Sequence, residues 1–352
     1  MMAVGVFGET LAACGSTGAP KSSATSGGHA PDPNVTITIV NAGGDETTAL
    51  TAGYVVPMTK ATGVHATFDP PQDFGRLEAM VKTGHPTADI FLVDGVFLDN
   101  AIAHDLVEKI DYSIVNPAPS IPGAQNPYGL GMEYFSTIMA WSAKANVGAV
   151  PQSWADFFDT KKFPGRRSLC DYPQFTVPAA LLADGVEPAN LYPLDVERAL
   201  AVLTRIKDSV TVWWTAGAQS SQLLVDGTTD YGNSWSGRVA NAITTGAKLG
   251  FTFNQGLIDT AYMVIPKGAA HINEALAFLH QVSLPQNEAA FAEILPYSGP
   301  AKGIDKYLPA KVLQFLPTSS KNYPLAVVQD ESAYSKQSDE IQKAWLKFKL
   351  TV

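Results

Sequence analysis

Residues 35–40 read Val35-Thr-Ile-Thr-Ile-Val40, and this stretch opens the folded part of the chain. Its β-branched residues alternate between apolar and polar, which is typical of a strand with one buried face. A helical stretch, 48–62, and a short strand, 65–68, follow; Asp73 can then cap a second helix before the apolar run 88–93. This succession of strands and helices predicts an α/β fold with a mainly parallel sheet.

A second run of the same kind begins near Ser136. Ser153 and Asp156 have the spacing of a capping box, and Asp195 can cap a long helix. The strands expected in this run are 136–141, 167–170, 210–214, 231–235, 249–253 and 260–265. Further helices are expected at 219–225, 239–245, 272–282 and 286–295, and the tail 301–352 is expected to be mostly helical. Two such runs without a long linker predict two lobes crossed by short strands.

Composition restricts the class of protein. The chain has 352 residues, of which 46% are hydrophobic, so it can bury the cores of two lobes. A formal net charge of -9 without a basic stripe argues against nucleic acid as a partner. The two cysteines and six histidines have no metal-site spacing, and no common catalytic motif is present. The sequence therefore predicts a protein that is not an enzyme and uses no metal or other cofactor.

The first 33 residues differ from the rest. Leu11-Ala-Ala-Cys14-Gly15 resembles a bacterial lipobox, in which the cysteine is lipidated after cleavage, and the segment 15–33 has the Ser- and Gly-rich composition of a flexible tether. Residues 1–33 are therefore expected to be a signal, lipobox and tether. Residues 1–9 carry no positive charge, so either the start codon is placed too late or the lipobox match is accidental. No stretch is long and apolar enough to span a bilayer.

Several motifs resemble one known family in their order and spacing. They are Ser153-Trp-Ala-Asp-Phe157, Ser234-Trp-Ser-Gly-Arg238, Val264-Ile-Pro-Lys-Gly-Ala269, Asn273-Glu-Ala-Leu-Ala-Phe278, Leu284-Pro-Gln-Asn-Glu288 and Tyr297-Ser-Gly-Pro300. The chain resembles the spermidine/putrescine branch of the extracellular solute-binding proteins of ABC transporters, which have the type II periplasmic-binding fold. This resemblance implies a central ligand cleft, two crossover strands and delivery of the ligand to the transmembrane subunits of a permease.

The same resemblance implies the division into lobes. Residues 34–137 and 260–300 are expected to form the first lobe, and residues 138–259 and 301–352 the second. The protein is expected to be a monomer that is anchored by lipid outside the cytoplasm, in the periplasm or at the outer face of the cell membrane.

Candidate ligand-binding residues lie at predicted strand ends, where open α/β sheets bind ligands. Trp235 ends a strand and could be a core tryptophan, but the resemblance implies that it lines the cleft. Arg238 could hold a carboxylate or form a structural ion pair. Asp94 could bind an amine or cap the next helix, and Asp259 could contact ligand or lie in a surface turn. Tyr262 adds a hydroxyl group. The candidates for which a structural role is an equal alternative are Glu133, Tyr134, Asp171, Tyr172, Trp214 and Gln219.

The candidate residues favour a particular kind of ligand. Polyamine-binding members are expected to carry acidic residues where this chain has Tyr172, Phe175 and Ala261, so a polyamine is disfavoured. One arginine, separated carboxylates and aromatic walls suit a small solute with an amine and a carboxylate, such as an ω-amino acid. Two other functions stay open: an enzyme on the same two-lobed fold, or a partner that presents the ligand to a sensory receptor.

Overall fold

The computed structural model describes residues 30–145 and 149–352. The strands are β1 (Thr36–Val40), β2 (His65–Phe68), β3 (Ile90–Asp94), β4 (Gln125–Asn126), β5 (Gly129–Ser142), β6 (Arg167–Cys170), β7 (Val210–Trp214), β8 (Tyr231–Trp235), β9 (Leu249–Val264) and β10 (Val327–Val328). The helices of the first half are α1 (Asp45–Leu50), η1 (Thr51–Val55), α2 (Val56–Thr62), α3 (Phe74–Lys82), α4 (Gly95–Ala103), α5 (Tyr112–Val115), α6 (Trp154–Phe158) and α7 (Pro173–Ala183). Those of the second half are η2 (Pro188–Asn190), α8 (Val196–Ile206), η3 (Lys207–Ser209), α9 (Gly217–Val225), α10 (Ser236–Thr244), α11 (Ile272–Val282), α12 (Pro285–Ile294), η4 (Ile304–Lys306), α13 (Ala310–Leu313), η5 (Tyr323–Leu325) and α14 (Glu331–Lys349).

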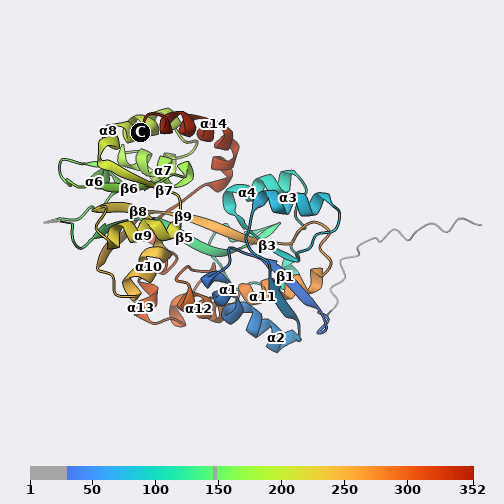
Figure 1. The fold of residues 1–352 in the computed structure, drawn as a ribbon. Coiled ribbons are helices and arrows are strands. Elements are labelled where there is room, and N and C mark those ends of the chain that lie inside the picture. Colours follow the sequence, from blue (N-terminus) through green and yellow to red (C-terminus); the bar gives the residue numbers. More distant parts are fainter. Residues whose placement is uncertain (1–29, 146–148) are drawn as a thin grey trace, which may run out of the picture.

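The strands of the described residues form one mixed sheet of ten strands. Its main order is β2-β1-β3-β9-β5-β8-β6-β7, with β10 beside β9 and β4 beside β5. Strands β1, β2 and β3 pair in parallel at one end, and β6, β7 and β8 pair in parallel at the other. The central strands β5 and β9 pair antiparallel with each other and with their outer neighbours. This arrangement confirms the predicted type II fold, and Figure 1 shows β5 and β9 running between the two parallel groups.

The central strand β9 is longer than expected. The sequence analysis predicted separate strands at 249–253 and 260–265, whereas β9 runs without a break from Leu249 to Val264. Gln255 has a positive φ of 56°, and the pairing with β5 shifts in register at this point. A β-bulge near Gln255 therefore accommodates residues between the two predicted strands, and the predicted break in the strand was wrong.

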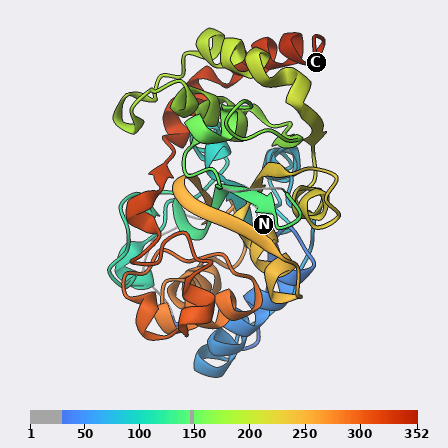
Figure 2. The ribbon, with the colours of Figure 1, turned by 90° about the vertical axis from the view of Figure 1, so that its left-hand side faces the viewer.

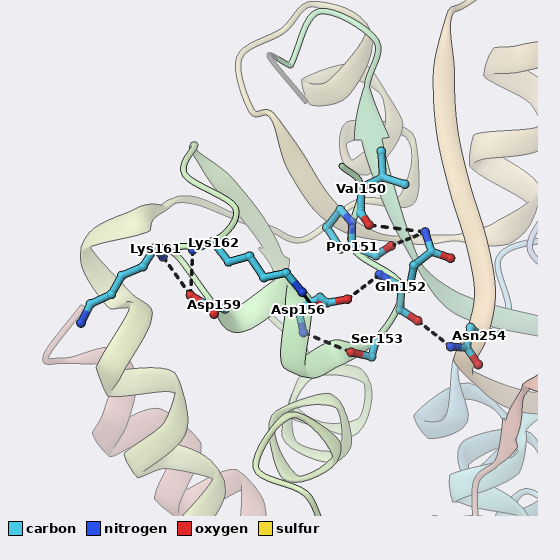
Figure 3. Close-up of polar contacts among 9 residues, drawn as sticks. All are labelled: Val150, Pro151, Gln152, Ser153, Asp156, Asp159, Lys161, Lys162 and Asn254. Carbon is cyan, nitrogen blue, oxygen red and sulfur yellow. Dashed lines mark hydrogen bonds and ion pairs between the residues drawn. The ribbon is translucent and has the colours of Figure 1, made fainter. Parts of the chain in front are cut away.

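Three predicted helix caps are confirmed. Asp73, Ser153 and Asp195 each accept a hydrogen bond from the backbone N–H three residues later, at the starts of α3, α6 and α8. Figure 3 shows the start of α6, where the Asp156 carboxylate also accepts from the Gln152 N–H (3.1 Å) and pairs with the Lys162 ammonium (2.7 Å). The Asn254 side chain donates to the Gln152 carbonyl and so ties this helix to the bulge region of β9.

Apolar side chains form a separate core on each side of the two central strands. One core holds Ile37, Leu50 and Phe278, and the other holds Trp154, Leu203 and Trp345. Helix α14 packs on α7 and α8 and also on α4, the helix that follows β3. Figure 2 shows α8 and the red C-terminal helix α14 side by side at one end of the molecule. The chain is therefore arranged as two bodies joined by β5 and β9.

The tail 301–352 divides between these two bodies. Ile304, Leu308 and Leu316 pack with Ala289 and Ala292 of α12. The segment before α14 contains only short helical turns, so the expectation of a mostly helical tail holds for α14 alone.

Candidate functional site: a charged cavity beside the crossing strands

A cavity of about 430 Å³ lies beside β5 and β9. Its walls come from both bodies: the start of α1, the end of β3 and the start of α4 on one side, and the starts of α7 and α10 on the other. The residues that line it are Ala42, Glu46, Gln72, Asp94, Phe97, Glu133, Phe135, Tyr172, Gln174, Phe175, Trp235, Arg238, Ala261 and Tyr297. The cavity therefore gathers strand ends from both halves of the sheet, where ligands bind in open α/β folds.

Five of the predicted site residues line this cavity: Asp94, Glu133, Tyr172, Trp235 and Arg238. Asp94 and Trp235 are the last residues of β3 and β8, and Tyr172 follows β6. Arg238 lies in the first turn of α10. These residues are far apart in sequence, but they lie together because each of them except Glu133 is at or just after the end of a parallel strand.

Arg238 and Trp235 form one wall. Within residues 30–145 and 149–352, neither the Arg238 Nε nor the Trp235 Nε1 has a hydrogen-bond partner, although both atoms are buried. No ion pair joins Arg238 to a carboxylate in the same ranges. An unpaired buried guanidinium donor is costly, so this wall is suited to receive an acceptor group from a ligand.

A close contact with α9 holds this wall in position. A Cβ atom on Gly217, the first residue of α9, would lie 2.6 Å from the Trp235 ring and 3.0 Å from the Arg238 Nε. Only glycine allows both side chains to pack this closely against the helix. The Trp235 ring also meets Phe135, Phe175 and Trp214 edge-to-face, with centroid distances of 5.4–5.9 Å.

Carboxyl groups form the opposite wall. Asp94 occupies the N-cap position of α4, but its side chain makes no capping hydrogen bond and instead lines the cavity. Burial raises the pKa of the Asp94 carboxyl. Burial also raises the pKa of Glu133 well above its usual range, and the adjacent Glu46 raises it further. The cavity thus places three acidic groups across from a single guanidinium.

Sequence reasoning missed Glu46, which is 6% exposed. Its carboxylate accepts a hydrogen bond from the Ala42 N–H at 2.6 Å. Glu46 follows β1 and a pair of glycines, Gly43 and Gly44, both with positive φ. The strand-end rule that located Asp94 could have located Glu46 as well. The other lining residues that were not singled out as ligand-binding are Ala42, Gln72, Phe97, Phe135, Gln174, Phe175, Ala261 and Tyr297.

Tyr134, Tyr262 and Asp259 lie away from this cavity. Successive side chains of a strand point to opposite faces, so Glu133 and Tyr134 cannot both face the same space. Tyr134 and Tyr262 line a second cavity behind the strands, and the Tyr262 hydroxyl donates to the Gly123 carbonyl. Asp259 is buried and accepts a hydrogen bond from the Gln329 side chain at 2.7 Å.

The remaining predicted residues have structural contacts. Trp214 is fully buried behind Trp235, and its indole N–H donates to the Asn233 carbonyl. Asp171 accepts from the Trp345 indole at 3.1 Å and pairs with Lys349. The Gln219 side chain accepts from the Thr215 N–H. Trp214, Asp171 and Gln219 therefore have structural contacts, which was the alternative role that the sequence analysis left open for them.

The described residues hold no group of three or more His, Cys, Asp or Glu side chains that could bind a metal ion. Among the described helices, none has both the length and the apolar character needed to cross a membrane. The predicted lipidation site, Cys14, lies outside the described residues.

The fold and the cavity define a two-lobed binding protein of the periplasmic-binding type. Residues 53–345 match the family described as "Bacterial extracellular solute-binding protein", and the chain belongs to that family. This membership confirms the broader part of the resemblance, which is the one to the solute-binding proteins of ABC transporters.

Similar proteins are known from several bacteria. The "Gamma-aminobutyric acid-binding protein" of Pseudomonas aeruginosa is 32% identical over 321 residues, covering 88% of this chain and 90% of the relative. An ABC transporter substrate-binding protein from Bradyrhizobium japonicum USDA 110 has a TM-score of 0.84 and 34% identity, covering 90% of this chain and 99% of its own. The structure described as "Atu4243-GABA receptor" has a TM-score of 0.82 and 31% identity, and the match covers 89% of this chain and 97% of that structure's chain. The relatives named here are binding proteins or receptors and not enzymes.

Proposed function

We propose that this protein captures a small solute bearing an ammonium and a carboxylate group and delivers it to the permease of an ABC importer. The observation that carries the proposal is the cavity's charge content: one guanidinium, Arg238, lines the same cavity as the acidic side chains Glu46, Asp94 and Glu133. A buried ligand charge needs a partner of opposite sign, because desolvation otherwise costs several kcal/mol. A zwitterion with its charges at opposite ends meets this requirement.

Within this class we propose an ω-amino acid such as γ-aminobutyrate. Its carboxylate would accept hydrogen bonds from Arg238, its ammonium would face the acidic wall, and its methylene groups would lie against Trp235 and Phe135. Two relatives that cover most of this chain are named for γ-aminobutyrate, which supports the choice.

Binding would involve closure of the two bodies over the cavity. Phe97 and Tyr172 line it from opposite bodies, and their side chains are 41% and 43% exposed. A hinge movement along β5 and β9 would bury these two rings together with the solute. We propose that the protein acts as a monomer in this cycle, and that its lobes follow the predicted ranges except that the boundary predicted after residue 300 falls close to β10.

A ligand panel tests the proposal. In calorimetry, γ-aminobutyrate is expected to bind with micromolar or better affinity, about -8 kcal/mol. Putrescine and spermidine are expected to bind far more weakly, because a second ammonium would face Arg238. The positions Tyr172, Phe175 and Ala261, where polyamine-binding members are expected to have acids, all line the cavity and carry no charge. Micromolar binding of putrescine, or a preference for uncharged sugars, would contradict the proposal.

We further propose that the protein is held outside the cytoplasm by a lipid on Cys14, followed by the tether 15–33. In cells that express the full-length precursor, Cys14→Ala is expected to move the protein from the membrane fraction to the soluble fraction. Fractionation and mass spectrometry of the N-terminal peptide measure this change. A soluble, unlipidated wild-type protein would show that the lipobox match is accidental.

A further inference from the structure

Glu46 and Glu133 both belong to the acidic wall of the cavity. Glu46 belongs to the first turn of α1 and Glu133 to β5, and each is 6% exposed. Both side chains line the same cavity, and each carboxyl group shifts the pKa of the other. Neighbouring buried carboxylates repel each other when both are ionised. One proton between them would leave the pair with a single negative charge.

The surroundings favour this shared proton. Burial is the main reason that the pKa of both carboxyl groups is raised, and for Glu133 the next reason is the charge of its partner. Across the cavity, Arg238 acts in the opposite direction and lowers the pKa of Glu133. The titratable or charged groups that face the pair from the surrounding elements are Tyr54, Asp94, Arg238 and Tyr297.

We propose that Glu46 and Glu133 share one proton in the unliganded protein and that the terminal ammonium of the solute takes its place on binding. This proposal rests on the function proposed above. In the exchange, the O–H···O hydrogen bond breaks, one proton leaves to solvent, and the ammonium donates N–H hydrogen bonds to both carboxylates. The pair is negative by one unit with its shared proton before binding and again with the bound ammonium afterwards, so below the pKa of the unliganded pair the two carboxylates always have a proton or a cation between them.

Two consequences follow from this exchange, and the second distinguishes the pair from a single ionised counter-ion. A trimethylated ammonium has no N–H to donate and cannot replace the shared proton, so the N-trimethyl analogue of γ-aminobutyrate is expected to bind at least tenfold more weakly. Affinity for γ-aminobutyrate is also expected to rise with pH, because the ammonium lowers the pKa of the pair and binding releases a proton. The rise ends above the raised pKa of the unliganded pair, where no shared proton remains.

Proton release can be counted by calorimetry in buffers of different ionisation enthalpy, between about pH 6 and about pH 8. We expect up to one proton to be released per γ-aminobutyrate bound, with affinity rising by at most about tenfold per pH unit. In Glu46→Gln, release is expected to fall by at least half. The control is Glu288→Gln, a buried carboxyl outside the cavity lining whose pKa burial raises to about 8; this variant should release as many protons as wild type.

The shared proton can also be detected without any ligand. An infrared difference spectrum between unliganded wild type and Glu46→Gln, taken near neutral pH, is expected to show the loss of one protonated carboxyl band. This measurement tests the pair even where γ-aminobutyrate does not bind, in which case only the proposed ligand is wrong. Absence of that band, or binding of γ-aminobutyrate with no proton release over the whole pH range, overturns the inference.

Discussion

Arg238→Ala is expected to weaken γ-aminobutyrate binding at least tenfold while leaving the fold intact. The guanidinium is the one cationic group in the cavity lining, and its Nε is buried without a hydrogen-bond partner among the described residues. Loss of a hydrogen bond to a charged group costs roughly 1.5–3 kcal/mol, which corresponds to a tenfold or larger change in affinity. Calorimetry measures the affinity, and thermal unfolding without ligand measures whether the fold is retained.

A matched variant separates this effect from a general loss of positive charge. Arg205→Ala removes an arginine whose side chain is 62% exposed and pairs with Asp184 outside the cavity. It is expected to bind the ligand as wild type does. If Arg238→Ala binds as tightly as Arg205→Ala, then Arg238 has a structural role and the zwitterion proposal is wrong.

Trp235→Ala is expected to reduce affinity by a similar factor and also to lower stability. The ring contacts Phe135, Phe175 and Trp214 edge-to-face, and such pairs are each worth about 0.5–1.5 kcal/mol. Its removal opens the wall on which the methylene groups of the solute would lie. We expect a loss of roughly 1–3 kcal/mol in the free energy of unfolding, measured by denaturation, together with at least tenfold weaker binding.

Trp213→Ala is the control for the stability component. Trp213 lies in β7 and packs on Trp345 and Phe348, away from the cavity. This variant should be destabilised but keep its affinity. Gly217→Ala offers a second approach, since its new Cβ would displace the Trp235 ring without removing it. Normal affinity in both Trp235→Ala and Gly217→Ala would show that this wall does not contact the solute.

Much of the fold could be predicted from local sequence. The helix caps at Asp73, Ser153 and Asp195 depend on one side chain and a backbone N–H three residues away, so short-range spacing identifies them. The same holds for Asp94 and Trp235, which end apolar or alternating strands and therefore lie at the ligand-binding edge of the sheet. Local pattern is sufficient where one short segment determines the geometry.

Other features depend on contacts that sequence spacing does not reveal. The continuity of β9 through Gln255 depends on pairing with β5, more than a hundred residues earlier in the chain. The shared cavity likewise brings together Glu46 of α1 and Glu133 of β5. Tyr134 is different: strict alternation with Glu133 already implies that the two side chains face opposite ways. Applying that rule to the predicted residues would have removed Tyr134 or Glu133 before the structure was known.

The pairing of β5 with β9 has a consequence for how such proteins diversify. Glu133, Phe135 and Ala261 point into the solute cavity, whereas Tyr134, Thr260 and Tyr262 point to the opposite side of the same two strands. The backbone hydrogen bonds that fix the register do not depend on either set of side chains. Mutation and selection can therefore exchange the inward residues for a new nutrient while the outward residues stay unchanged. A lineage built on these strands can change what it collects without having to evolve a new way to open and close.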